Sequence, residues 1–229
     1  MSVVEALEGT MRLHRIVEYQ AKTVTRHTTD SQQEYEYIEG LVEGIKTPLP
    51  ATGHDYLIAT PFRYPLPVAA SYQARFKPPL SSRHAFYGTE EFRTCSYETA
   101  YHWLRQRVHL KALSQVAEPR THFQVQFHDS QLMDIRHHRS LESVMNRHDY
   151  QASHRFVEKH PSLSSILYPS CRDPQQGACV VTFRLETLGK RPEVLHTLSF
   201  IYDRQHRGCR IENPVQPEDG FQVSWEEVS

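Results

Sequence analysis

The spacing of hydrophobic residues predicts a helix over residues 31–45. Apolar side chains recur there on one helical face, and Ser31 and Glu34 form a capping-box pattern at its start. Pro48 and Pro50 follow closely. Because proline lacks the amide hydrogen that a helix interior needs, they end the helix.

A longer helix is expected over 96–110, with Thr94 or Ser96 as its N-cap. Shorter helical patterns occupy 141–145 and 150–159. The longer helix carries one apolar stripe, which we expect to be buried. Its members are Ala100, Trp103, Leu104 and Val108.

Strand patterns dominate the second half of the chain. Phe123, Val125 and Phe127 alternate with polar residues, which is typical of a half-buried strand. Further strands are expected at 86–87, closed by Gly88, and at 165–168, 178–185, 194–202 and 209–212, while an extended run over 55–60 stops before Pro61. Helices early and strands late predict an α+β fold with a mixed or antiparallel sheet.

Composition and motif content argue against several classes of protein. The 229 residues suit one large domain or two small ones, and 26 basic against 27 acidic residues give no global field that would attract nucleic acid. No apolar run approaches the roughly 20 residues of a membrane span, and the first residues lack a signal-peptide pattern. We therefore expect a cytoplasmic protein without direct nucleic-acid or membrane contact. Neither a dinucleotide-binding G-x-G-x-x-G nor a P-loop is present.

Cysteine and histidine do not predict a metal centre. The four cysteines show no C-x-x-C spacing, so we expect reduced, largely buried thiols. Of the 15 histidines, five crowd between 137 and 160, without an H-E-x-x-H pattern. Solvated surface histidines are the favoured interpretation there, with zinc binding as the alternative.

Three short stretches carry candidate chemistry. The first places Arg63 and Tyr64 among prolines and aromatics and is followed by Arg75. Guanidinium groups suit phosphate oxygens and aromatic faces stack on heterocycles, but arginine also stacks on aromatics in stiff surface loops. On spacing alone, these two interpretations stay open.

The second stretch contains Tyr87 and Glu98, and the third contains Ser170. Glu98 falls in the first turns of the expected helix, where the helix dipole alone favours a carboxylate. Turn chemistry alone accounts for the residues around Ser170. No G-x-S-x-G surrounds this serine, so a hydrolase nucleophile is not indicated.

Taken in order, these stretches resemble the RES-domain toxins, a family named for an Arg, a Glu and a Ser. The matching residues are 60–64, Arg75-Phe76, Phe86-Tyr87-Gly88, 94–100 and 168–177. Upstream, Arg15-Ile16-Val17-Glu18, Thr25-Arg26 and Asp30-Ser31 resemble the longer members. The chain departs from the family pattern in two places. Where Gly-Ser-Arg-Phe is common, it reads Gln73-Ala74-Arg75-Phe76. Where Gly-Gly often ends the serine loop, it reads Gln176-Gly177.

The resemblance implies a fold similar to ADP-ribosyltransferases, with a split mixed sheet, surrounding helices and an N-terminal helical extension. Residues 1–50 would form that extension and 51–229 the RES domain. It also implies that NAD is the substrate and is cleaved between nicotinamide and ribose by phosphorolysis or hydrolysis. Implied partners are inorganic phosphate, an Xre-type helix-turn-helix antitoxin and a second copy of the chain, and no metal is implied.

By the same resemblance, Arg63, Glu98 and Tyr87 would be catalytic. NAD and phosphate would be bound by Arg63, Tyr64, Arg75, Tyr87 and Ser170. Glu98 would stabilise the positive charge that develops on the ribose, and the arginines would hold phosphate oxygens.

Three other functions remain open at this level. An ADP-ribosyltransferase would use the same residues and mark a protein. A non-catalytic module could bind RNA through its arginine and aromatic side chains, although the balanced charge argues against it. A structural protein with a Tyr- and Arg-rich surface is the simplest alternative.

Overall fold

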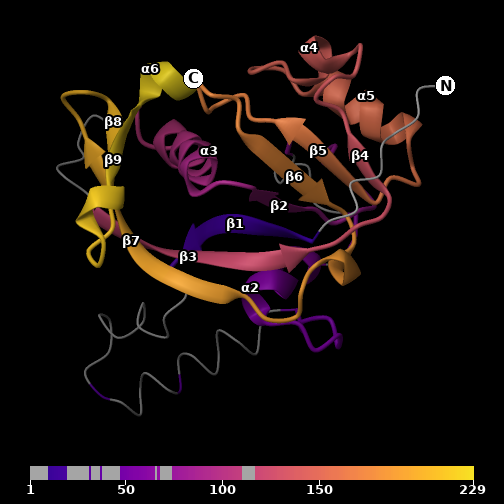
Figure 1. The fold of residues 1–229 in the computed structure, drawn as a ribbon, viewed down its shortest axis with the longest axis horizontal. Coiled ribbons are helices and arrows are strands. Elements are labelled where there is room, and N and C mark those ends of the chain that lie inside the picture. The colour runs from indigo at the N-terminus through magenta and orange to yellow at the C-terminus, as the bar shows by residue number, and fades with distance from the viewer. Residues whose placement is uncertain are drawn as a thin grey trace.

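The computed structural model describes residues 10–19, 31, 37, 47–64, 66–67, 74–109 and 117–229. One nine-stranded sheet forms the framework, in the order β4-β5-β6-β2-β1-β3-β7-β8-β9 (Figure 1). Only β4 and β5 pair in parallel, and the other neighbours are antiparallel. The fold is therefore α+β with a mixed sheet, as the sequence predicts. The strands are β1 (Met11–Glu18), β2 (Phe86–Thr89), β3 (Ala117–Phe127), β4 (Leu132–Asp134), β5 (Ser165–Pro169), β6 (Ala178–Thr182), β7 (Glu193–Asp203), β8 (Gly208–Glu212) and β9 (Phe221–Ser224).

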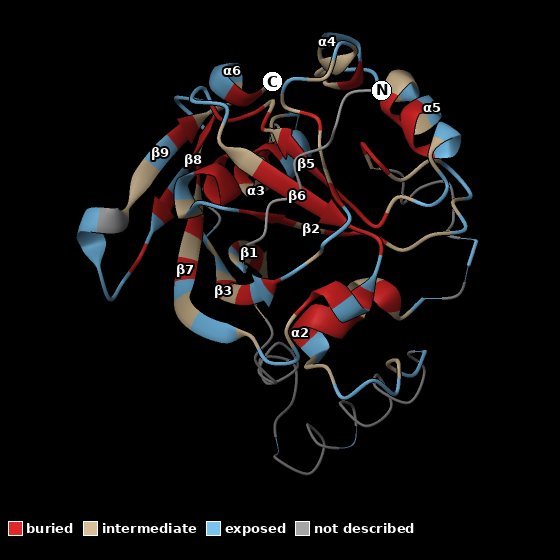
Figure 2. Ribbon diagram, turned by 45° about the vertical axis from the view of Figure 1, so that its right-hand side comes forward, coloured by how far each residue is buried: buried red, intermediate tan, exposed pale blue. Residues whose placement is uncertain are grey.

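Helices cover both faces of this sheet (Figure 2). On one face, the long α3 and short α6 pack on β7, β8 and β9, and α4 and α5 pack beside β5 and β6. On the other face lie α2 and the 3-10 turn that continues it. The helices are α2 (Tyr56–Ala59), α3 (Phe92–Arg105), α4 (Leu141–Val144), α5 (Gln151–Lys159) and α6 (Trp225–Val228), and the 3-10 turns are η2 (Thr60–Phe62), η4 (Leu185–Thr187) and η5 (Pro217–Asp219).

Strand pairing in the sheet is least extensive between β2 and β1. Only one residue pair, His14 and Thr89, is in register there, whereas β1 and β3 share eight pairs. The nine strands thus form two groups, which we call wings: β4-β5-β6-β2 and β1-β3-β7-β8-β9. The wings meet at a narrow seam between β2 and β1. Helix α3 crosses above it, because it contacts both β1 and β2.

Most predicted strands and helices are confirmed. Ala100, Trp103 and Leu104 of the predicted stripe are buried on α3, but the helix ends at Arg105 and not near 110, so Val108 lies beyond it and is only partly buried. The predicted caps are wrong, because α3 begins at Phe92 with Glu91 as N-cap. Thr94 and Ser96 are instead buried inside the helix, where their hydroxyls donate to Asp173 and to the Phe92 carbonyl.

Two N-terminal expectations differ from the structure. Residues 11–18 are a strand near the middle of the sheet, so this part of 1–50 belongs to the core and not to a helical extension. The predicted helix over 31–45 lies outside the described residues, apart from positions 31 and 37. The run 55–60 is helical rather than extended, because the Asp55 carboxylate accepts a hydrogen bond from the Leu57 amide at 2.9 Å and caps α2.

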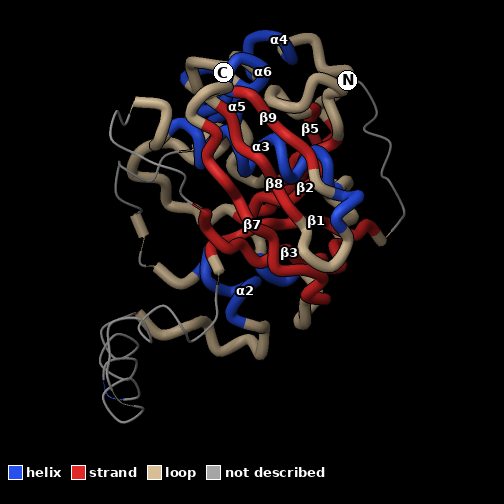
Figure 3. Tube along the Cα trace, turned by 90° about the vertical axis from the view of Figure 1, so that its left-hand side faces the viewer, coloured by secondary structure: helices blue, strands red, loops and turns tan. Residues whose placement is uncertain are grey.

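Strands β7 to β9 lie side by side at one edge, and α6 follows them (Figure 3). A buried arginine, Arg172, ties α6 to the rest of the molecule. Its guanidinium donates to the Val228 carbonyl at 2.7 Å and the Arg147 carbonyl at 2.6 Å, and lies 3.5 Å from the Tyr101 ring centroid. Arg172 is only 2% exposed, so these oxygens have little access to water.

We predict that Arg172→Met lowers the free energy of unfolding by about 2–4 kcal/mol, because two buried carbonyls lose their donor. Urea denaturation measures this change. Arg155→Met is the matched control, since Arg155 is exposed on α5 and, among the described residues, its side chain hydrogen-bonds to Gln151. Equal stability of the two variants would contradict the assignment.

Candidate active site

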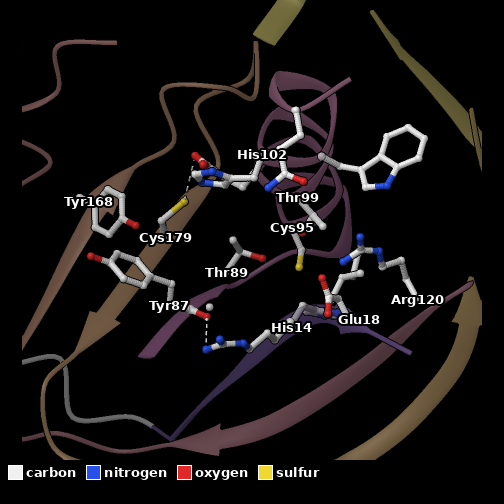
Figure 4. Close-up of a pocket in the computed structure, with 16 residues that line it drawn as sticks. His14, Glu18, Tyr87, Thr89, Cys95, Thr99, His102, Arg120, Tyr168 and Cys179 are labelled. Carbon is white, nitrogen blue, oxygen red and sulfur yellow. Dashed lines mark hydrogen bonds between the residues drawn. The ribbon is translucent and has the colours of Figure 1, made fainter. Parts of the chain in front are cut away.

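A cavity of about 390 Å³ lies between α3 and the sheet at the seam (Figure 4). In the close-up, Tyr87, Tyr168 and Cys179 lie at one end and Glu18 and Arg120 at the other. A volume of this size is typical of small-molecule sites. Its wall comes from β1, β2, β3, β5, β6 and α3: His14, Arg15, Ile16, Glu18, Tyr87, Gly88, Thr89, Cys95, Glu98, Thr99, His102, Trp103, Gln106, Arg120, Tyr168 and Cys179.

Glu98 and Ser170 meet at this cavity although 72 residues separate them. The Ser170 hydroxyl donates to Oε1 of Glu98 at 2.6 Å. A short O–H···O⁻ bond of this kind is strong and fixes the orientation of the carboxylate. The thiol of Cys179 approaches the same oxygen at 3.9 Å. The second oxygen, Oε2, has no hydrogen bond to the described residues.

The turn after β5 holds Ser170 rigidly. Its hydroxyl oxygen accepts from the backbone amides of Arg172 and Asp173, both at 3.0 Å, while its own amide donates to Gly177. Gly177 has no room for a side chain, since an added Cβ would lie 1.9 Å from the Thr94 hydroxyl oxygen. The serine turn is thereby pressed against the first turn of α3.

Tyr87 stands on β2 with its side chain toward the cavity. Its hydroxyl accepts a hydrogen bond from the Phe76 amide at 3.2 Å. Burial raises the pKa of Tyr87 above the usual range, so the phenol stays neutral. Tyr168 on β5 is buried beside it, and burial also raises its pKa. Two neutral aromatic groups thus form one end of the cavity.

Arg75 lies near Tyr87 but does not line the cavity. Its Nη1 donates to the Val144 carbonyl at 3.2 Å and the Asn146 carbonyl at 2.7 Å. The guanidinium also lies 4.7 Å from the Tyr150 ring centroid. In the described structure this residue holds the end of α4, and its positive charge favours ionisation of Tyr87 only slightly against burial.

Arg63 and Tyr64 are not brought together with Glu98. Arg63 follows η2 on the other face of the sheet, and its Nε donates to the Thr47 carbonyl. Tyr64 is 54% exposed. Neither residue belongs to the described wall of the cavity. Their assigned roles in NAD and phosphate binding stay predictions.

Sequence analysis missed Arg15 as a site residue. It sits on β1, donates to the Tyr87 carbonyl at 3.2 Å and stacks 4.3 Å from the Phe86 ring centroid. Burial lowers the pKa of Arg15 to about 10, which leaves it charged at neutral pH. The available signal was an arginine in the otherwise apolar row Met11, Leu13 and Val17.

A chain of hydrogen bonds runs along the sheet beside the cavity. Gln124 Nε2 lies 2.7 Å from His14 Nε2, and His14 Nδ1 lies 2.9 Å from His122 Nε2. His122 is only 2% exposed. Desolvation, together with the neighbouring His14 and His196, lowers its pKa to about 3. These histidines are internal, unlike the surface histidines expected from the sequence between 137 and 160.

No group of three or more potential metal-binding side chains gathers within the described ranges. Among the same residues, no helix is long and apolar enough to span a membrane. All four cysteines are free, and only Cys171 is more than slightly exposed.

The RES-domain family model matches residues 47–203. The chain belongs to the RES-domain family. The matched region runs from before α2 to the end of β7 and contains Tyr87, Glu98 and Ser170. A chain in the crystal structure of the M. tuberculosis MbcT-MbcA toxin-antitoxin complex is similar at 11% identity, over 84% of this chain and 85% of that chain, with a TM-score of 0.43. No curated protein matches the sequence.

The buried histidine predicts acid sensitivity. His122 has a pKa of about 3 in the folded protein against 6.5 when unfolded, so the unfolded chain binds more protons between these values. The free energy of unfolding should be unaffected by His122 above pH 6.5 and should decrease as the pH falls toward 3, by up to ~1.4 kcal/mol per unit.

Urea denaturation between pH 4 and pH 7 tests this. His122→Gln should flatten the dependence, whereas His137→Gln, at an exposed position, should leave it unchanged. A wild-type slope that survives in His122→Gln would contradict the assignment.

Proposed function

We propose that this RES-domain protein cleaves the bond between nicotinamide and ribose in NAD. The observation that carries the proposal is Glu98, which lines the cavity together with Tyr87 and Tyr168 and is held from behind by the Ser170 hydroxyl at 2.6 Å. The family resemblance, which implies NAD as substrate, supports the same conclusion.

The chemistry requires stabilisation of a cation. Nicotinamide leaves with the electron pair of the C–N bond, and positive charge develops on the ribose. A carboxylate fixed beside that ribose stabilises the charge electrostatically. Ser170 donates to one oxygen of Glu98, so Oε2 faces substrate without reorganisation. Tyr87 and Tyr168 would stack on the leaving ring and exclude water from it.

We further propose an ADP-ribosyltransferase-like architecture. Support comes from the single registered pair at the seam, which divides the sheet into two wings with α3 across the gap. The N-terminal helix over 31–45 stays part of this proposal. On the family resemblance alone, Arg63, Tyr64 and Arg75 would bind the phosphate groups of NAD.

The family resemblance also supports a cytoplasmic toxin restrained by an Xre-type helix-turn-helix antitoxin. A second copy of the chain and inorganic phosphate are proposed on the same basis, the latter as an alternative acceptor to water. Protein modification would use the same cleavage step, and only the acceptor would differ.

The decisive variant is Glu98→Gln, which keeps the shape and the Ser170 contact but removes the charge. Nicotinamide release from NAD, followed by chromatography, should fall by ~10²–10³. Glu142→Gln, exposed on α4, is the control and should retain wild-type activity. Unchanged release by Glu98→Gln would reject the proposal. Label that passes from NAD to protein instead of free ADP-ribose would identify a transferase.

A further inference from the structure

His102 lies one helical turn beyond Glu98 on α3 and lines the same cavity. Residues four apart on a helix share a face, so a molecule at the Glu98 carboxylate can also contact the imidazole. In the close-up, His102 lies at the end of the cavity that contains Tyr168 and Cys179. No hydrogen bond joins its ring nitrogens to the residues that the structure describes, and the residue is exposed.

The surroundings keep this imidazole neutral. Desolvation by the cavity wall lowers the pKa of His102, and the charges of Arg172, Arg105 and Arg75 lower it further. Glu98 acts in the opposite direction and raises it. The balance is a lowered pKa, so His102 has a free lone pair at neutral pH and can accept a proton.

Each arginine of the cavity wall has a protein partner. Arg15 donates to the Tyr87 carbonyl. Arg120 lies at the opposite end of the cavity from Cys179, whose thiol approaches Glu98 (Figure 4); there it donates to Glu118 at 3.1 Å, and its Nε has no partner among the described residues. A phosphate dianion needs several free donors to replace its hydration, whereas water needs only an acceptor for its proton. With Arg120 at the far end of the cavity, the described residues around Glu98 fit water better than a phosphate dianion.

We propose that His102 is a catalytic residue that takes the proton from a water molecule attacking the ribose, which makes the protein an NAD glycohydrolase. This inference rests on the proposed function and specifies its acceptor. The water oxygen forms a bond to the ribose carbon as the C–N bond breaks, and its proton passes to His102. The proton then leaves to solvent, so that NAD⁺ and water give ADP-ribose, nicotinamide and H⁺.

The test compares water with an acceptor that carries no proton. His102→Gln should hydrolyse NAD ~10²-fold more slowly than the wild type, the usual contribution of a positioned base. Azide needs no deprotonation, so its addition should restore nicotinamide release in His102→Gln and give the ADP-ribosyl azide by mass. His128→Gln, at an exposed position outside the cavity, should behave as wild type.

The outcomes separate the two proposals. Wild-type hydrolysis by His102→Gln, or a loss that azide does not restore while the melting temperature is unchanged, overturns the role of His102 alone. A second variant, His102→Asn, should give the same azide dependence if Gln disturbs α3. No nicotinamide release from the wild-type protein would overturn the proposed function itself.

Discussion

The fold depends on the contact between the two central strands β2 and β1, which are barely paired. Between β2 and β1 only one pair is in register, and an unpaired strand edge inside a protein leaves backbone groups without partners. Arg15 compensates by donating from β1 to the Tyr87 carbonyl on β2. A long side chain thus replaces a hydrogen bond of the ladder and holds the wings slightly apart. The cavity occupies this opening beneath α3.

The site follows from that opening. Tyr87 points into it because β2 continues past the registered pair, and Glu98 points into it because α3 crosses the seam. Ser170, which follows β5 in the same wing as β2, reaches Glu98 through the turn that Gly177 allows to approach Thr94. Three segments distant in sequence therefore converge: β2 and the serine turn from one wing, and α3 from above the gap. A preorganised carboxylate is the chemical result.

Sequence reasoning succeeded where the local pattern and the packing agree. The strands expected at 165–168 and 178–185 correspond to β5 and β6, and Ala100, Trp103 and Leu104 on α3 are buried as their periodicity predicts. Predicted helix starts were wrong where a polar side chain makes a hydrogen bond that the local pattern does not indicate. Thr94 looks like a helix cap but donates to Asp173, and Asp55 starts a helix where the following proline suggested extended chain.

The candidate site was only partly predictable, for related reasons. Glu98 and Ser170 were found through the order of the family motifs, yet their direct contact could not be read from spacing. Arg15 interrupts the apolar alternation of β1 and so concealed a central strand. His102 belongs to no motif that the sequence displayed, and its relevance comes only from its position one turn after Glu98.

Arg172 connects the turn that holds Ser170 to α6, which follows the edge strand β9. It follows Ser170 by two residues, and its guanidinium holds the last turn of α6, which lies outside the region that the family model matches. Binding and folding are linked whenever a ligand prefers one state of a segment. Substrate that tightens the serine turn should therefore also suppress local opening of β8, β9 and α6. Under the proposed function, changes in that peripheral segment would in turn alter how firmly NAD is retained.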